Sequence, residues 1–318
     1  MKPSPEPRKH HYLPQFYLRG FSIDRRGLFQ LEKASANHYG CQIKDIAAIR
    51  DYHELDGEGT SDPYALEKKL AELEGLQASH LQGALLEGIS LDHHRLNLIE
   101  LLSVMRMRVP AVKEHIDQSY GGAVRATALA LQRTGRLPKP PEGFEEALRV
   151  ENLNIEVLNW KCLEVMFRMG TNEKILGILS NMRATLYRAP FGARFITSDQ
   201  PVALYHPTLS RSAYGAGPAT LGIELSFPLS SRALLRLDHV KQPHAERVAS
   251  SEEVTEFNRR TIVMAQSYAY TGEAPERAVA AIRSAGNTFA GFRHENFDAG
   301  REFLQIHRFV PVGPASSR

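Results

Sequence analysis

The spacing of the apolar residues changes once along this chain, near residue 183, and this change constrains the fold more than any other feature of the sequence. Between residues 61 and 183, apolar side chains recur every three or four residues, which predicts helices that pack through one face. The clearest such stripe consists of Leu66, Leu70, Leu73, Leu81, Leu85 and Ile89. After residue 183, the apolar runs are short and bounded by Pro, Gly, Ser or Asp, which is typical of strands. The sequence therefore predicts an α+β protein, a helical bundle with a smaller, mostly antiparallel β-sheet half.

The expected elements divide the chain into three parts. Residues 1–60 are expected to form an N-terminal arm with edge elements, including a strand at 28–31. Residues 61–183 are the helical region, with helices at 62–89, 92–110, 122–134, 145–169 and 172–182. Residues 184–318 are the β-rich region, with a late helix at 250–268 and strands at 184–188, 193–197, 202–205, 221–227, 233–237 and 303–312. Because 318 residues exceed the usual size of a single core, we expect one two-lobed domain or two packed domains, and we favour a single two-lobed unit.

The charge of the chain is nearly balanced, but it is unevenly distributed. The 39 Lys and Arg residues against 36 Asp and Glu residues give a net charge of +3, too small to attract polyanions strongly. Between residues 91 and 140, however, basic residues clearly outnumber acidic ones. We expect Arg106, Arg108 and Arg133 to present a basic surface in this segment that could bind nucleic acid or a small anion.

The cysteine content and the hydropathy indicate the compartment. Cys41 and Cys162 are the two cysteines, and a pair so distant in sequence does not make a disulfide framework, which favours a reducing compartment. The first residues lack the apolar segment of a secretory signal, and no later segment approaches the roughly 18 apolar residues of a membrane span. We therefore expect a cytoplasmic protein that does not enter the membrane.

The first segment that could carry chemistry is HHYLPQFYLRGF, at residues 10–21. His10 and His11 could exchange protons near neutral pH or bind a metal, and Arg19 could hold a phosphate or carboxylate through two hydrogen bonds. The alternative is structural, because the aromatic residues could simply anchor an N-terminal arm. The sequence specifies no cofactor and leaves the need for a metal open.

The second segment is TSDQPV, at residues 197–202. Asp199 follows an expected strand, where it could serve as a general base, a metal ligand or the partner of a histidine. Ser and Asp before Pro are also preferred turn residues, so a turn is the alternative. The neighbouring imidazole and carboxylates of residues 51–54 are expected to lie in a solvated loop, since adjacent side chains on an extended segment point to opposite faces.

These two segments, with FPLS at 227–230, give the chain a resemblance to an uncharacterised bacterial family of unknown function. Members of that family tend to begin with H-H-Y-x-P-x-F-Y-L-x-x-F and to carry a later S-D-x-P. The resemblance extends over nearly the whole chain, including the helix that ends in RMRVP at 106–110. It implies no reaction, although a role in defence or stress is the analogy that it suggests. The matching positions are His10, His11, Tyr12, Pro14, Arg19, Ser198, Asp199 and Pro201.

Three functional interpretations follow from these residues. In the first, the chain is a hydrolase of phosphodiester or nucleotide bonds, with His10 or His11 as proton carrier, Asp199 as base or ligand and Arg19 stabilising negative charge. In the second, it is a non-catalytic module that binds or senses a protein, a nucleic acid or a small anion, using the basic segment and a mobile loop at 210–220. In the third, both segments are purely structural, with the arm packed on the β half and Asp199 fixing a turn.

Overall fold

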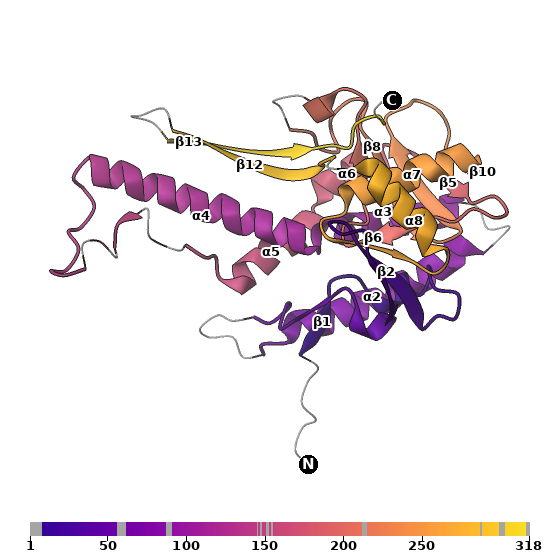
Figure 1. Cartoon of the computed structure of the whole chain (residues 1–318), viewed down its shortest axis with the longest axis horizontal. Coiled ribbons are helices and arrows are strands. Elements are labelled where there is room, and N and C mark those ends of the chain that lie inside the picture. The colour runs from indigo at the N-terminus through magenta and orange to yellow at the C-terminus, as the bar shows by residue number, and fades with distance from the viewer. Residues whose placement is uncertain are drawn as a thin grey trace, which may run out of the picture.

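The computed structural model describes residues 8–315 apart from residues 56–61, 87–90, 145, 147, 151, 152, 154, 212–214, 287 and 299–302. Most helices and sheets pack into one body. The long helix α4 (Pro110–Arg133) and the hairpin of β12 (Gly291–Asp298) and β13 (Phe303–Val310) extend from it together, to the left in Figure 1. Helix α4 contacts both strands of the hairpin.

Two sheets form the β part of the body. The larger has the strand order β10-β5-β9-β8-β7, and β10 runs parallel to β5 while the other neighbours are antiparallel. The smaller has the order β3-β2-β11-β6 and is antiparallel. A separate antiparallel pair joins β1 (Lys9–His11) to β4 (Ala48–Arg50). The strands of the larger sheet are β5 (Arg183–Arg188), β7 (Ala203–Tyr205), β8 (Glu224–Ser230), β9 (Ala233–Asp238) and β10 (Ala245–Val248), and those of the smaller are β2 (Gly27–Glu32), β3 (His38–Gln42), β6 (Thr197–Ser198) and β11 (Tyr268–Thr271).

The helices begin where the sequence supplies a cap or a proline. Asn172 caps α6 by accepting from two backbone amides, and Ser250 and Glu253 form a capping box at α7. Pro110 is the first residue of α4, where its missing N–H costs nothing. The described helices are α1 (Gln15–Leu18), α2 (Ala65–Leu85), α3 (Leu91–Met107), α4, α5 (Asn159–Gly170), α6 (Glu173–Ser180), α7 (Ser251–Met264) and α8 (Pro275–Ala285), with short 3₁₀ turns η1 (Ile43–Asp45) and η3 (Leu209–Arg211).

The α+β class with mostly antiparallel sheets is confirmed, and two helix predictions are wrong. The helix expected from residue 122 begins at Pro110 and runs through Gly121. The described residues before Asn159 in the predicted 145–169 helix are mostly not helical, and α5 supplies only the later part. They lie along α4 instead, because Asp117 accepts from the amide of Val157 at 2.7 Å and Arg125 donates to the carbonyl of Leu153 at 2.6 Å. Gly121 permits this approach, since a Cβ there would lie 3.0 Å from the carbonyl oxygen of Ile155. The three-part division of the chain stays a prediction.

The N-terminal arm is fixed to the β part by aromatic residues. The buried hydroxyl of Tyr17 donates to the carbonyl of Pro228 at 2.8 Å and lies 2.7 Å from the hydroxyl of Thr197. The Tyr17 ring stacks on Phe227 with centroids 5.5 Å apart. Residues 10–21, the TSDQPV segment and the FPLS segment therefore meet at one side chain, although they are far apart in the sequence.

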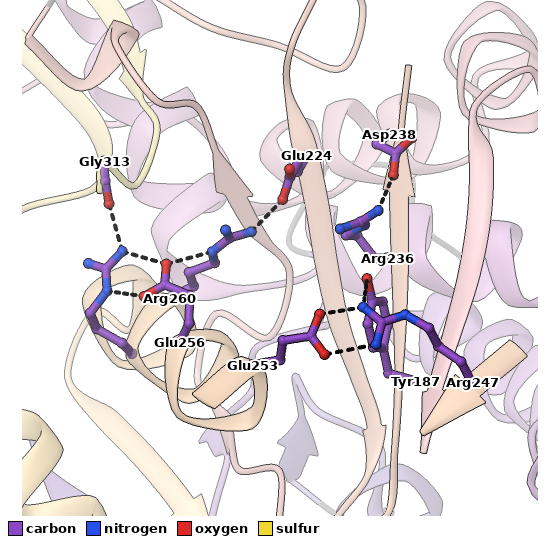
Figure 2. A network of polar contacts seen from close by, with 10 residues as sticks. Tyr187, Glu224, Arg236, Asp238, Arg247, Glu253, Glu256, Arg260 and Gly313 are labelled. Carbon is purple, nitrogen blue, oxygen red and sulfur yellow. Dashed lines mark hydrogen bonds and ion pairs between the residues drawn. The ribbon is translucent and has the colours of Figure 1, made fainter. Parts of the chain in front are cut away.

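Ion pairs fasten α7 to the larger sheet and fix the base of the hairpin. Arg260 of α7 is buried between Glu224 of β8, at 2.6 Å, and Glu256 of its own helix, at 2.9 Å (Figure 2). The neighbouring Arg259 donates to the carbonyl of Gly313, three residues beyond β13, at 2.7 Å. The amide of Val312 also bonds to the carbonyl of Leu204 at 2.7 Å. These contacts hold the end of the hairpin against the body.

None of the described helices combines the length and the low polarity that a membrane crossing requires.

Candidate metal centre

His10 is fully buried in a hydrogen-bonded network. Its Nδ1 accepts from the backbone amide of His53 at 2.9 Å, and the two rings stack with centroids 5.5 Å apart. His53 Nδ1 lies 2.5 Å from the carboxylate of Glu67 on α2. The expectation that residues 51–54 form a solvated loop is wrong for His53, which is only 2% exposed because the β1–β4 pair brings it under α2.

His10, His53 and Glu67 are close enough to hold a metal ion, but their hydrogen bonds account for the arrangement without one. Burial lowers the pKa of His53, against the effect of the hydrogen bond to Glu67. Burial alone would raise the pKa of Glu67, but the hydrogen bond and charge of His53, with smaller contributions from His10 and Arg108, lower it overall. A neutral imidazole donating to a carboxylate satisfies both groups. We interpret this network as the attachment of the N-terminal arm to α2.

The other residues proposed for catalysis also have contacts of their own. Arg19 is exposed and donates to Gln15 Oε1 at 3.2 Å, within the same turn of helix. His11 is partly buried, and burial together with the charge of Lys9 lowers its pKa. The arm does fold back toward Asp199, but through Tyr12, whose hydroxyl lies 3.3 Å from that of Tyr270. The joint catalytic role of His10, His11, Arg19 and Asp199 stays a prediction that these contacts do not support.

Asp199 closes a turn. Its buried carboxylate accepts three backbone N–H groups, from Gln266 at 2.8 Å, Ser267 at 2.6 Å and Tyr268 at 2.9 Å. Burial raises the pKa of Asp199, and the three amides oppose that rise. The carboxylate thereby joins β6 to the segment between α7 and β11. Its accepting capacity is largely used, which leaves little for proton transfer.

The three arginines proposed for anion binding lie in different environments. Arg108 is buried, its guanidinium lies 2.9 Å from Glu74 Oε1, and it donates to the carbonyl of His11 at 2.8 Å, so it holds α2, α3 and the arm together. Arg133 is at the last turn of α4, where it has a partner of its own. Arg106 is different: it is partly buried, and no described residue forms an ion pair or hydrogen bond with it.

A second group of histidines has the geometry of a metal site. His115 of α4, His294 of β12 and His307 of β13 each place a ring nitrogen within 4.8 Å of the other two. His115 Nδ1 is 3.1 Å from His294 Nε2, and His294 Nδ1 is 2.5 Å from His307 Nδ1. With metal-to-nitrogen bonds of about 2.0–2.1 Å, tetrahedral zinc separates its ligand nitrogens by roughly 3.3 Å. The two short distances involve opposite nitrogens of His294, but one nitrogen from each ring lies within 4.8 Å of the other two, so rotation of the rings could bring three nitrogens onto one metal.

The surroundings of the three rings favour their neutral forms. Burial and the neighbouring histidines lower the pKa of His115 to about 4. Burial also lowers the pKa of His294 and of His307. The ring of His115 stacks on Phe292 of β12 with centroids 3.9 Å apart, which fixes its orientation. Neutral rings present nitrogen lone pairs, the form that binds a metal.

A pocket of about 320 Å³ opens beside this centre, and His115 and His294 form part of its wall. Glu114 also lines it, and its carboxylate is held at both oxygens: Gln118 Nε2 donates to one at 3.0 Å and Gln266 Nε2 to the other at 2.8 Å. The remaining polar lining includes Lys33 and Gln200. Lys33 donates to the carbonyls of Val263 and Ala265 at the end of α7, and its ammonium group retains a third N–H.

The sequence indicated part of this pocket and missed its centre. Gln200, which lines the pocket, belongs to the TSDQPV segment. Gln266, which also lines it, donates its backbone N–H to the carboxylate of Asp199 in the same segment. His115, His294 and His307 form no spaced motif. The register of the hairpin, which pairs His294 directly with His307, is the signal that would have found two of them.

Comparisons with known proteins identify a family. Neither the curated proteins nor the solved structures gave a match. A family described as "Protein of unknown function (DUF4238)" matches residues 9–274, which include His115 and end before β12. Because this match spans well over half of the chain, including all three segments noted in the sequence, the protein belongs to the DUF4238 family.

Proposed function

We propose that this protein is a metal-dependent hydrolase of phosphodiester or nucleotide bonds, with its metal bound by His115, His294 and His307. The observation that carries this proposal is the convergence of three neutral imidazoles from α4 and the hairpin on the wall of a pocket. Three histidine ligands leave a fourth coordination position open, which is the arrangement of catalytic zinc sites. A metal bound there would lower the pKa of a coordinated water and polarise a phosphoryl oxygen.

Glu114 is the residue best placed to accept a proton beside this centre. It lines the same pocket as His294, and its charge influences the titration of that ring. Gln118 and Gln266 each donate to one of its oxygens, so the carboxylate has a fixed orientation and keeps lone pairs that can accept a proton. We assign Glu114 the role of general base toward the attacking water.

The alternative is a non-catalytic binding module in which a metal fastens the hairpin to α4. The observation that favours it is that two of the three ligands lie on the hairpin, which extends from the body beside α4 (Figure 1). A metal shared between these elements would order the hairpin. In this interpretation Glu114 has no role in turnover.

Metal content and hydrolysis, measured together, test these interpretations. Purified wild-type protein is expected to bind about one zinc or manganese ion per chain, and His115→Ala and His294→Ala are expected to lose it. His38→Ala, which changes an exposed histidine on β3, is the matched control. Metal retained in both centre variants would rule out this site.

Hydrolysis of bis(4-nitrophenyl) phosphate then distinguishes a catalytic metal from one that only holds the hairpin against α4. Glu114→Gln is expected to keep the metal and to lower kcat by at least about 100-fold, the usual contribution of a general base. Metal binding without hydrolysis of this diester or of 4-nitrophenyl phosphate would favour the binding module.

A further inference from the structure

The Arg106 guanidinium is a positive charge that the described part of the chain does not neutralise. It lies near the end of α3, and neither a carboxylate nor a carbonyl of a described residue bonds to it. Burial lowers the pKa of Arg106 to about 10. Arg106 is partly buried, and its nitrogen atoms are not among the enclosed atoms that lack a partner, so the guanidinium remains in reach of a ligand. An arginine in this state is suited to a ligand with negative charge.

Arg106 lines a small hollow that adjoins the pocket of the candidate metal centre. Gln200 and Phe292 form part of the wall of both spaces, and Phe292 is the ring on which His115 stacks. The hollow has a volume of about 20 Å³, which is enough for roughly one water molecule or one ligand oxygen. A molecule seated in the larger pocket could therefore place one oxygen beside Arg106.

Positively charged side chains outnumber carboxylates around the two spaces. Lys33 and Arg106 are positive, and Glu114 is the sole carboxylate among the described residues that line either space. A divalent metal on the three histidines would add two positive charges. The 320 Å³ of the larger pocket lies at the lower end of the range for small-molecule sites, which run from about 300 to 1,000 Å³. A nucleic acid duplex would not enter it.

We propose that the pocket binds a small molecule through an anionic oxygen group, a phosphoryl group or a carboxylate, with one oxygen held by Arg106. The inference rests on the proposed function for the identity of the pocket as a substrate site. The anion site itself is formed by the chain alone, so it can be tested without a metal. Arg106 would then determine specificity, because an arginine on a reacting phosphoryl group raises affinity for anions over neutral compounds of the same shape.

The test is anion binding by the full chain in the presence of a chelator. Inorganic phosphate and acetate are titrated separately, by calorimetry and by thermal unfolding, into wild type, Arg106→Gln and Arg106→Lys. Arg168→Gln, which removes an exposed arginine paired with Glu164 on α5, is the control. Arg106→Gln is expected to weaken binding by about 10- to 100-fold, the loss typical of a hydrogen bond to a charged group. Arg106→Lys should show an intermediate affinity, since it keeps the charge and loses the fork of donors.

Stability in buffer free of the titrated anions supplies an independent readout. Because Arg106 has no partner in the described chain, Arg106→Gln is expected to melt at the same temperature as wild type or higher, while phosphate should raise the melting temperature of wild type alone. A lower melting temperature for Arg106→Gln, or equal anion affinity in the two proteins, would overturn the anion site. Binding of acetate but not phosphate would support the site and overturn the phosphodiester assignment. Loss of metal binding in the histidine variants has no bearing on this result, so the two proposals can fail separately.

Discussion

Replacing Asp199 by alanine should destabilise the fold, and the structure gives the size of the effect. The substitution removes the acceptor for the amides of Gln266, Ser267 and Tyr268, which lie between 2.6 and 2.9 Å from the carboxylate. A hydrogen bond to a charged group contributes about 1.5–3 kcal/mol. Three such bonds would give roughly 5–9 kcal/mol if they were additive. The three bonds share one carboxylate, however, so their contributions do not add fully. Alanine also removes the unfavourable free energy of burying a carboxylate, the same burial that raises the pKa of Asp199.

We therefore expect a loss of about 3–5 kcal/mol in the free energy of unfolding, the range found when one partner of a buried charged group is removed. The unfolding entropy of a globular chain is about 2.1 cal/mol/K per residue, so 318 residues give roughly 0.7 kcal/mol/K. The melting temperature should fall by about 4–7 °C. Asp199→Asn should lose less, because one oxygen still accepts, but its amide group would face at least one backbone donor.

Urea denaturation followed by circular dichroism and by the fluorescence of Trp160 measures this change. The matched control is Asp24→Ala. Asp24 also accepts two backbone amides and one hydroxyl, and these bonds lower its pKa to about 2, but it is fully exposed, so water can replace it and the effect should be much smaller. If Asp199→Ala left the urea midpoint unchanged while abolishing hydrolysis, Asp199 would be a chemical group and the structural interpretation would be refuted.

Three further substitutions or conditions probe the fold. Burial lowers the pKa of His53, and the hydrogen bond to His53 lowers the pKa of Glu67, so the folded state binds fewer protons than the unfolded state. The free energy of unfolding should therefore fall as the pH drops below about 6.5. His53→Asn should make this fall smaller, as measured by thermal unfolding between pH 7.5 and 4. Gly272→Ala should lower the free energy of unfolding in urea by about 1–3 kcal/mol, because the new Cβ would lie 2.1 Å from a backbone carbonyl oxygen. Gly40→Ala is the control: no atom lies within 4 Å of its Cβ position, so its effect on stability should be small. Arg260→Ala should lower the free energy of unfolding by about 2 kcal/mol in the same assay. This is less than for a fully buried ion pair, because the two carboxylate partners of Arg260 are about one third exposed. An unchanged urea midpoint would contradict the role of these ion pairs in holding α7 against the sheet.

The sequence predicted best those elements whose ends are marked locally. Asn172 and Ser250 act as caps directly before the helices they begin, and the strand Gly27–Glu32 begins at the glycine that ends the expected turn. Strand β11 was missed because its identity depends on pairing with β2 and β6, which are distant in the chain. The helix expected at 145–169 failed for a related reason, since contacts with α4 hold Leu153 and Val157, which the structure describes, in a non-helical conformation.

The candidate site was harder to predict than the fold. Its three histidines come from α4 and from two strands that turn back on each other, and His115 and His294 are 179 residues apart. No spacing rule links such positions, because only the packing of the hairpin on α4 brings them together. Arg106, by contrast, was proposed as an anion-binding residue from the local excess of basic residues, and its lack of a described partner keeps that expectation open for testing.

Asp199 affects the candidate site without contacting the histidines. Gln200, the residue after Asp199, lines the pocket. One of the three backbone amides that donate to the Asp199 carboxylate belongs to Gln266, and the side chain of Gln266 donates to Glu114 at 2.8 Å. Loss of the carboxylate would therefore release two residues of the pocket wall and the orientation of the proposed base together. A fall in hydrolysis after substitution of Asp199 would follow from that displacement, accompanied by lower stability and by an unchanged set of metal ligands. The residue that the sequence suggested as a general base or metal ligand thus holds two residues of the pocket wall in place.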